Sequence, residues 1–456
     1  MGYVLRSCIL RSSRLRKVMF PKWITGNTFA SSTYTKSVTD SEIVFPEAEL
    51  DFEFLCKPEN KHEIEFNILH RKGVGNINKV HELYMRLKNE TLSEEEKSIM
   101  LKELNDEARK IPNMSYSPLK AYGENPYILK VMNDERKFNF KPKEFNELAK
   151  SLKLIRTENL GNFTGQRSYY LLGELSELEQ ALIHFSLNSL LKKGFQLVSV
   201  PDILPREIIE SCGMDTKGPR TQVYELDPEL YDADVCLSGT SEMALAGLHM
   251  NTKFPIKDLP LKLAAVSRCY RAETSSIADE RGIYRVHQFT KVEMFGVATQ
   301  DQSADLLEEF REIQEQNFAS LGLYIKTLDM PLCELGAPAY RKYDIEAWLP
   351  GRQMFGELSS CSNCTDYQSR RLNIKYQQKG SGDISLHAHT VNGTACAIPR
   401  MLIALFETHQ QEDGTIVIPE ILQPYMKGRT KISKQTGIPD MMFIKSKHWE
   451  KKQIKG

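Results

Sequence analysis

The stretch "SRCYRAETSSIADERGIYRVHQFTKVEMFG" (residues 267–296) decides the fold. Arg271 and Glu273 alternate on an expected strand, so both side chains point to one face of a sheet. A polar loop follows, and the chain returns with chemistry-bearing side chains at the same period of two. These are Arg285, His287, Phe289, Lys291 and Glu293. The stretch therefore predicts an antiparallel hairpin with a functional face.

The residue types on this face suit a nucleotide and an ammonium group. Arginine binds a phosphate or carboxylate through two parallel hydrogen bonds. A phenylalanine ring can cover a nucleobase, and a glutamate can receive an ammonium group. The alternative is a solvated ladder of cross-strand ion pairs without a ligand.

Three further stretches carry candidate site residues. In "SGTSEMALAG" (238–247), Thr240 and Glu242 alternate. In "FGELSSCSNCTDYQSRR" (355–371), Glu357 and Ser360 could hold a hard cation such as Mg²⁺ through oxygen. In "NGTACAIPR" (392–400), Arg400 stands at the entrance of an expected helix, where free backbone N–H groups favour a phosphate.

The order of expected elements indicates an α+β fold with a mainly antiparallel sheet flanked by helices. The pattern predicts a long helix over 174–194, a strand ending at Pro201, and a helix after Arg400. Residues 41–60 are expected to be a connector and residues 111–127 a linker. Between them, two apolar stripes and a capping box at Ser93 and Glu96 predict a short helical hairpin.

Composition sets few limits on partners, because 60 basic residues balance 60 acidic ones. The charge is uneven, however. Residues 1–39 carry seven Lys or Arg and no acid, and they are rich in Ser and Thr. This pattern predicts a mitochondrial presequence, with a disordered basic arm as the alternative. Residues 427–456 carry nine Lys or Arg. This basic tail could bind a polyanion, or it could simply be a solvated tail. No apolar run is long enough for a membrane span.

The Cys-x-x-Cys pair at Cys361 and Cys364 could bind a metal or run a redox cycle. A structural zinc site needs four ligands, and the other seven of the nine cysteines form no second pair. His387 and His389 do not have the usual partner spacing. The surroundings also lack the strand-then-helix unit of redox pairs. We therefore expect buried, reduced thiols.

The motifs together resemble a known family. "RCYRAE…RGIYRVHQFTKVE" resembles motif 2 of class II aminoacyl-tRNA synthetases, and "NGTACAIPRMLIALFETHQQEDG" resembles motif 3. The helix and strand that end at Pro201 resemble motif 1. The combination with "GTSE", "ELSSCSNCTDYQSRR" and "HTVNGT" is similar to the seryl-tRNA synthetases, the mitochondrial form in particular.

The resemblance implies a serine–tRNA ligase that uses ATP and Mg²⁺, acts on tRNA(Ser) in the mitochondrial matrix, and dimerises through motif 1. The dimer would be a homodimer or a heterodimer with a paralogue. The implied domains are a presequence (1–39), a shortened tRNA-binding helical arm (40–115), a class II catalytic domain (116–427) and a basic tail (428–456). No membrane is involved.

The resemblance also implies a role for each matched residue. Arg271, Arg400 and Glu357 would be catalytic, and Glu357 and Ser360 would hold the metal. Serine would contact Thr240, Ser241, Glu242, Arg271, Glu293, Asn392 and Thr394. ATP would contact Arg271, Ala272, Glu273, Val286, His287, Gln288, Phe289, Glu357, Leu358, Ser359, Ser360 and Arg400.

Two departures from the family pattern keep other readings open. The arm has only about forty residues between Arg71 and Pro112, and Ile277 stands in the motif 2 loop where family members often have glycine. A non-catalytic mitochondrial paralogue that acts as a binding partner is one alternative. A nucleic-acid-binding module that merely uses the fold is another, and it would need a larger basic surface.

Overall fold

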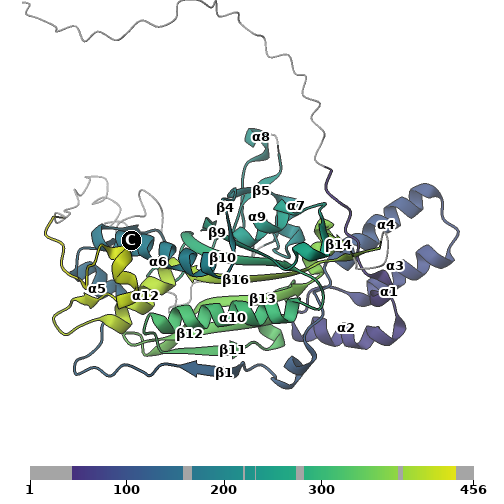
Figure 1. Ribbon diagram of the computed structural model, residues 1–456. Helices are drawn as coiled ribbons and strands as arrows, with labels where there is room; N and C mark the ends of the chain where they lie inside the picture. The colour runs from purple at the N-terminus through teal and green to yellow at the C-terminus, as the bar shows by residue number, and fades with distance from the viewer. Residues whose placement is uncertain are drawn as a thin grey trace, which may run out of the picture. The chain divides into compact units, whose positions relative to one another are not determined.

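An antiparallel sheet built around the 267–296 hairpin forms the centre of the fold (Figure 1). Within the described residues it has eight strands, in the order β1-β11-β12-β13-β16-β10-β9-β4. Neighbouring strands are antiparallel, except that β4 runs parallel to β9. The strands are β1 (Tyr127–Met132), β4 (Gln196–Val198), β9 (Leu261–Tyr270), β10 (Gln288–Ala298), β11 (Ile325–Asp329), β12 (Arg341–Leu349), β13 (Met354–Thr365) and β16 (His389–Ala397).

The computed structural model describes residues 44–157, 167–218, 221–231, 233–273, 282–377 and 384–437. The described residues from Phe45 onward belong to one compact unit. The expected presequence, most of the motif 2 loop with Ile277, and the tail from residue 438 lie outside the described residues. In the described part of the chain, no helix is long and apolar enough to cross a membrane.

Alternation along β10 divides the sheet into an apolar face and a polar face. Val292 and Met294 are fully buried in the main hydrophobic core. Their neighbours Lys291 and Glu293 point to the opposite face and line a cleft. Because successive side chains of a strand point to opposite faces, one strand supplies both core and site.

Three helices cover the apolar face: α6 (Gly173–Lys192), α10 (Ser303–Ser320) and α12 (Ile398–His409). Figure 1 shows α10 lying across β12 and β13. The close approach of α10 depends on two glycines of the sheet. A Cβ at Gly296 would lie 2.5 Å from Leu306 of α10, and one at Gly393 would lie 3.2 Å from Phe310. A side chain at either position would push the helix away from the sheet.

The polar face is covered only in part, by α7 (Arg206–Ser211), α9 (Ser241–Leu248) and α11 (Tyr367–Leu372). Leu263, Ala265, Phe295 and Val297 of the sheet pack against these helices in a second core. The remaining part of this face stays open and forms the cleft.

The expected helical hairpin is present as α3 (Ile77–Asn89) and α4 (Glu94–Arg109). Ile77 and Val80 of the first stripe and Met100 and Leu104 of the second are buried between them. The expectation of a connector at residues 41–60 is wrong in its second half, because α1 (Phe52–Leu55) and α2 (Pro58–His70) begin there. Asp51 caps α1 and Pro58 opens α2, so short-range helix signals in this stretch outweigh its polar composition.

The capping box at the start of α4 has both of its hydrogen bonds. The Ser93 hydroxyl accepts from the Glu96 backbone N–H at 3.3 Å, and the Glu96 carboxylate accepts from the Ser93 N–H at 2.9 Å. We expect Ser93→Ala to destabilise the chain by about 0.5–2 kcal/mol, because an N–H group of the first turn loses its acceptor. Thermal unfolding measures this loss. An unchanged unfolding temperature would contradict it.

Smaller elements surround the main sheet. They are α5 (Phe145–Ser151), α8 (Pro228–Tyr231), β2 (Ile155–Arg156), β3 (Tyr170–Leu171), β5 (Ile203–Pro205), β6 (Tyr224–Glu225), β7 (Val235–Leu237), β8 (Lys253–Pro255), β14 (Lys375–Gln377), β15 (Ser385–His387), β17 (Ile416–Val417) and β18 (Lys431–Ile432). Short 3₁₀ turns lie at Ser117–Ala121, Ile256–Asp258, Leu332–Glu334 and Glu420–Met426.

Candidate active site

A cleft of about 1070 Å³ opens on the polar face of the sheet, between α9 and the base of the arm. The structure brings most of the expected site residues to its walls. They are Thr240, Glu242, Arg271, Glu273, Val286, Phe289, Glu293, Glu357, Leu358, Ser359, Ser360, Asn392, Thr394 and Arg400.

Four expected site residues are not part of the cleft lining. Ser241 is buried in the first turn of α9, Ala272 is half-buried, and Gln288 is exposed. The imidazole of His287 turns away, and its Nδ1 lies 2.9 Å from the Tyr224 hydroxyl. On the returning chain, the alternate side chains of Phe289, Lys291 and Glu293 therefore line the cleft as expected, but that of His287 does not.

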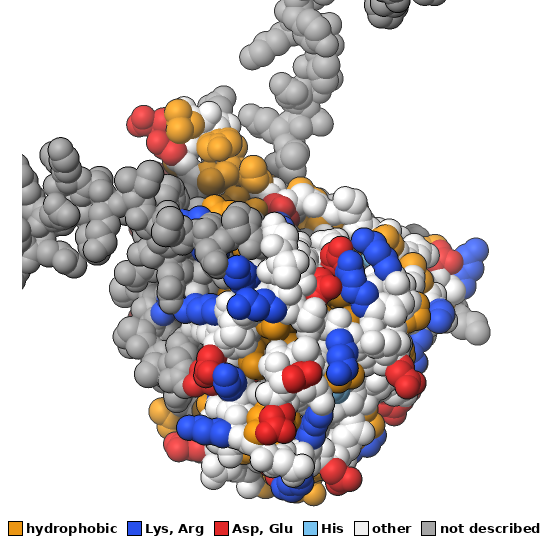
Figure 2. All heavy atoms as spheres, turned by 90° about the vertical axis from the view of Figure 1, so that its left-hand side faces the viewer, with side chains coloured by type: hydrophobic (Ala, Val, Ile, Leu, Met, Phe, Trp, Pro, Cys, Tyr) orange, Lys and Arg blue, Asp and Glu red, His pale blue; other side chains and the backbone are white. Residues whose placement is uncertain are grey.

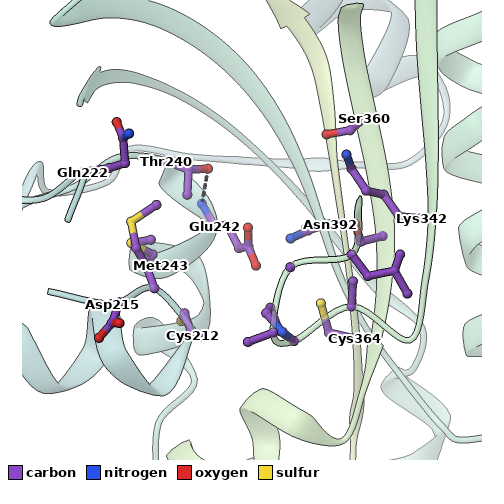
Figure 3. Close-up of a pocket in the computed structure, with 18 of the residues that line it drawn as sticks. Cys212, Asp215, Gln222, Thr240, Glu242, Met243, Lys342, Ser360, Cys364 and Asn392 are labelled. Carbon is purple, nitrogen blue, oxygen red and sulfur yellow. Dashed lines mark hydrogen bonds between the residues drawn. The ribbon is translucent and has the colours of Figure 1, made fainter. Parts of the chain in front are cut away.

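One end of the cleft is an acidic pocket. Glu242 enters it from the first turn of α9, whose N-terminus is capped by the Thr240 hydroxyl (Figure 3). Glu293 enters from β10 and is 3% exposed. Across the strand pair, the Thr394 hydroxyl donates to the Glu293 carboxylate at 3.1 Å. Two carboxylates and a hydroxyl therefore face a small enclosed space.

A buried lysine compensates only one of these two charges. Lys291 lies 2.6 Å from the Glu293 carboxylate and donates to the Thr240 hydroxyl at 2.7 Å. Burial and the charge of Glu293 raise the pKa of the Glu242 carboxyl, while Gln368, Lys291 and Asn392 lower it, and the net shift is upward. Burial therefore disfavours the ionised form of Glu242 in the empty pocket, and a cationic ligand beside it would favour that form.

Arg271 lies beside the acidic pocket, and its backbone differs from the expectation. The expected strand through Arg271 and Glu273 is wrong, because β9 ends at Tyr270 and Glu273 has a φ of +43°. The left-handed backbone breaks the alternation, yet both side chains still line the cleft. The Arg271 guanidinium donates to the Gly239 carbonyl at 3.4 Å and lies 5.4 Å from the centre of the Phe289 ring.

Arg400 enters the same cleft from motif 3. It lies in the first turn of α12, where Pro399 leaves no backbone N–H to satisfy. Its guanidinium lies 3.2 Å from the Glu357 carboxylate and 4.7 Å from the centre of the Tyr284 ring. Burial pushes the pKa of Glu357 upward, but the charges of Arg400 and Lys342 outweigh it, so the pKa is lowered. Glu357 is therefore held ionised beside Arg400.

A β-bulge in β13 places Glu357 and Ser360 on the same side. Residues three apart on a regular strand point to opposite faces. Here the pairing with β12 shifts between Ile345↔Ser359 and Glu346↔Glu357, so Leu358 is an extra residue. Both Glu357 and Ser360 consequently line the cleft.

Glu273 closes the cleft on the side of the motif 2 loop. Its side chain is 5% exposed and lies 3.4 Å from Arg285 and 4.0 Å from Arg167. Its backbone N–H donates to the Gln222 side chain at 3.1 Å. A buried carboxylate held between cations can accept hydrogen bonds from a ligand amino group without losing its position.

Sequence reasoning missed several residues of the site. Lys342 of β12 lines the cleft 2.8 Å from Asp344, and Tyr284 packs under Arg400. Gln368 of α11 donates to the Glu242 carboxylate at 2.7 Å. Lys291 could be found from the alternation of side chains along β10. Lys342, Tyr284 and Gln368 could not be found from any local pattern, because the site they belong to is formed by residues that lie far apart in the sequence.

Both thiols of the cysteine pair are free and buried. Cys361 and Cys364 are each 1% exposed, and burial raises the pKa of both thiols well above the usual value. Among the described residues, no group of three or more His, Cys, Asp or Glu could hold a metal ion. This agrees with the expectation of buried, reduced thiols.

The sheet topology, the two converging arginines and the acidic pocket define a class II aminoacyl-tRNA synthetase core. In agreement, residues 224–409 match the family model for the tRNA synthetase class II core domain (G, H, P, S and T). The mitochondrial serine–tRNA ligase of Bos taurus is 44% identical over 352 residues, which cover 76% of this chain and 67% of the relative. The Mus musculus counterpart is 42% identical over 78% of this chain and 68% of the relative. The chain belongs to the serine–tRNA ligase family.

Solved structures give the same assignment of the fold. The seryl-tRNA synthetase from Pyrococcus horikoshii, complexed with ATP, superposes with a TM-score of 0.73 at 27% identity, over 85% of this chain and all of the other. The cytoplasmic serine–tRNA ligase from Naegleria fowleri, in complex with AMP, gives a TM-score of 0.75 at 28% identity, over 85% of this chain and 99% of the other.

Proposed function

We propose that this chain is a mitochondrial serine–tRNA ligase, which activates serine with ATP to seryl-adenylate and transfers the seryl group to mitochondrial tRNA(Ser). One observation carries the proposal: Arg271 and Arg400 line the same cleft as an acidic pocket formed by Glu242 and Glu293. The pocket suits the ammonium group of an amino acid, and the arginines suit a carboxylate and a triphosphate. The family membership supports this assignment.

Alignment and charge stabilisation account for the chemistry. A carboxylate oxygen of serine attacks the α-phosphorus of ATP, and the bond to the bridging oxygen of pyrophosphate breaks. The two reactants are both anionic, so Arg271 between the pocket and the nucleotide would offset their repulsion. Arg400 would stabilise charge on the departing pyrophosphate. A terminal ribose hydroxyl of tRNA then attacks the acyl carbon, and AMP leaves.

The serine side chain would be read by hydrogen bonds. Thr394 and Asn392 lie on β16 beside Glu293, within reach of a small hydroxylated side chain. Thr394 is buried and Asn392 is half-buried, so alanine would occupy the pocket without the hydrogen bonds that the serine hydroxyl would make there. Rejection of alanine therefore follows from the polarity of the pocket rather than from its volume.

The residues present fit Mg²⁺. Glu357 and Ser360 offer two oxygen donors on one side of β13, and Mg²⁺ commonly takes one or two protein ligands while phosphates and water complete its shell. Glu357 is also kept ionised by Arg400. When bound, the cation would neutralise phosphate charge.

Location and assembly form part of the proposal. The mitochondrial relatives support a mitochondrial location, and the acid-free residues 1–39 support import into the matrix. Motif 1 corresponds to α6 and β4, where Leu191 and Leu197 are 45% and 53% exposed. Exposed apolar side chains on this helix and strand support a dimer through motif 1, either a homodimer or a heterodimer with a paralogue.

The two alternatives, a non-catalytic paralogue and a nucleic-acid-binding module, have less support. The charged residues that a non-catalytic paralogue would be expected to lose are present in the cleft. On the face drawn in Figure 2, Lys and Arg are interspersed with Asp and Glu, and hydrophobic side chains gather on the projection at its top. In the coloured part of that face the two signs of charge are mixed, whereas a nucleic-acid-binding module would need a larger basic surface.

Serine-dependent exchange between ATP and labelled pyrophosphate tests activation. Charging of mitochondrial tRNA(Ser) then tests transfer and the shortened arm. We expect both activities with serine, and exchange with alanine reduced by several orders of magnitude. An absence of serine-dependent exchange in the folded protein would favour the non-catalytic paralogue.

The thiol of Cys364 should be dispensable for this activity. It lines the cleft, yet burial keeps it protonated, so it is no nucleophile. We expect Cys364→Ser to keep most of its exchange activity, with stability lowered by about 1–3 kcal/mol because a hydroxyl is buried. Exchange assays and elemental analysis check this. Loss of a stoichiometric metal together with activity would reverse the conclusion.

A further inference from the structure

Gln368 lies behind the acidic pocket without lining it. It is fully buried on α11, and its amide nitrogen donates to Oε1 of Glu242 at 2.7 Å. Its amide oxygen accepts from the Thr390 hydroxyl at 2.7 Å. Since an ionised carboxylate only accepts hydrogen bonds, the amide nitrogen must face Glu242, and the Thr390 hydroxyl holds this orientation.

The helix that carries Gln368 is fixed on two sides. Arg371 donates to the Tyr367 carbonyl at 2.8 Å and to the Arg109 carbonyl, at the end of α4, at 3.1 Å. Arg370 pairs with Asp366 at 2.7 Å and with Asp51, before α1, at 3.1 Å. Because Arg370 and Arg371 tie this short helix to the segment before α1 and to the end of α4, Gln368 can hold Glu242 in one rotamer.

The chemistry of an amide suits this position better than a cation would. The charged and titratable groups that face Glu242 are Glu293 and Lys291 of β10, Cys212 of α7 and Cys364 of β13, and the Asn392 amide faces it from β16. A second cation in place of Gln368 would neutralise the pocket and compete with an ammonium ligand. A neutral donor stabilises the ionised carboxylate and leaves its charge uncompensated.

We propose that Gln368 is a positioning residue of the amino-acid subsite: oriented by Thr390, it aims the Glu242 carboxylate so that the ammonium group of the substrate becomes its counterion. The inference rests on the proposed function, in which Glu242 receives the serine ammonium. Figure 3 shows the Glu242 carboxylate pointing from α9 towards the wall that carries Asn392. Gln368 itself would not touch the substrate.

Gln368→Met is the decisive variant, because methionine fills nearly the same volume but cannot donate. The KM for serine in pyrophosphate exchange should rise about tenfold to a hundredfold, as for the loss of a hydrogen bond to a charged group. The KM for ATP should be unchanged. Thr390→Val keeps Gln368 but frees its amide, and it should raise the KM for serine by a smaller factor.

The pH dependence separates positioning from a general loss of structure. A donor to the ionised form lowers the pKa of Glu242, so removing it raises that pKa further. As pH falls, Glu242 is then protonated earlier. The rise of the serine KM at acid pH should therefore begin at a higher pH in Gln368→Met than in the wild type.

Gln410→Met is the matched control. Gln410 is also fully buried, but its amide donates to the Lys143 and Glu407 carbonyls, away from the cleft. It should lower the unfolding temperature without changing the serine KM or its pH profile. An unchanged serine KM and pH profile in folded Gln368→Met would overturn the inference. A wild type without serine-dependent exchange would instead overturn the proposed function, and the inference with it.

Discussion

Arg271→Ala is expected to lower serine-dependent pyrophosphate exchange by about 10²–10³-fold, equivalent to about 3–4 kcal/mol of transition-state stabilisation. The guanidinium lies between the acidic pocket and the Phe289 ring, where the serine carboxylate and the α-phosphate would meet. Both groups are anions, so loss of the Arg271 charge leaves their mutual repulsion less compensated. Steady-state exchange at saturating ATP measures the effect.

Two further variants make this result specific. Arg271→Lys keeps the charge but loses the two parallel donors, so it should recover only part of the activity. Arg268 lies on β9, three residues before Arg271, but is exposed outside the cleft, and Arg268→Ala should leave exchange unchanged. Near-normal exchange in Arg271→Ala would refute the assigned role, and with it the convergence of charge on which the proposed function depends.

Arg400→Ala is expected to lower kcat/KM for ATP by a similar factor of about 10²–10³. Arg400 combines a positive charge with the start of α12, and Glu357 and the Tyr284 ring hold it in place. Its removal takes away charge stabilisation of the leaving pyrophosphate and frees Glu357. Because the acidic pocket keeps its own contacts, serine binding should change far less than ATP use.

The control for Arg400 is an arginine that also pairs with carboxylates but lies outside the cleft. Arg429 pairs with Glu177 and lies 3.5 Å from Glu174 on α6. Arg429→Ala should cost at most about 1 kcal/mol of stability and leave exchange intact. If Arg400→Ala raised the KM for serine and left ATP use unchanged, the two substrates would have to exchange places in the cleft.

Local patterns predicted the elements well where the signal and its partner lie close in sequence. The 267–296 hairpin, the long helix α6 and the capping box at Ser93 all depend on residues within a few positions of each other. The helix α2 was missed because the polar composition of residues 41–60 outweighed, in the prediction, the short-range start signal of Pro58. The strand through Arg271 was extended too far, because alternation alone does not reveal where pairing ends.

The sequence by itself determined which side chains alternate on β10 and β16, and which motifs assign the chain to its family. Only the tertiary structure decided that Leu358 is an extra residue that turns Glu357 and Ser360 to one side, and that Gln368 meets Glu242. Alternation follows from backbone dihedral angles that each residue sets with its neighbours. Register shifts and contacts between distant elements depend instead on how strands pair and helices pack across the whole sheet, which no short stretch specifies.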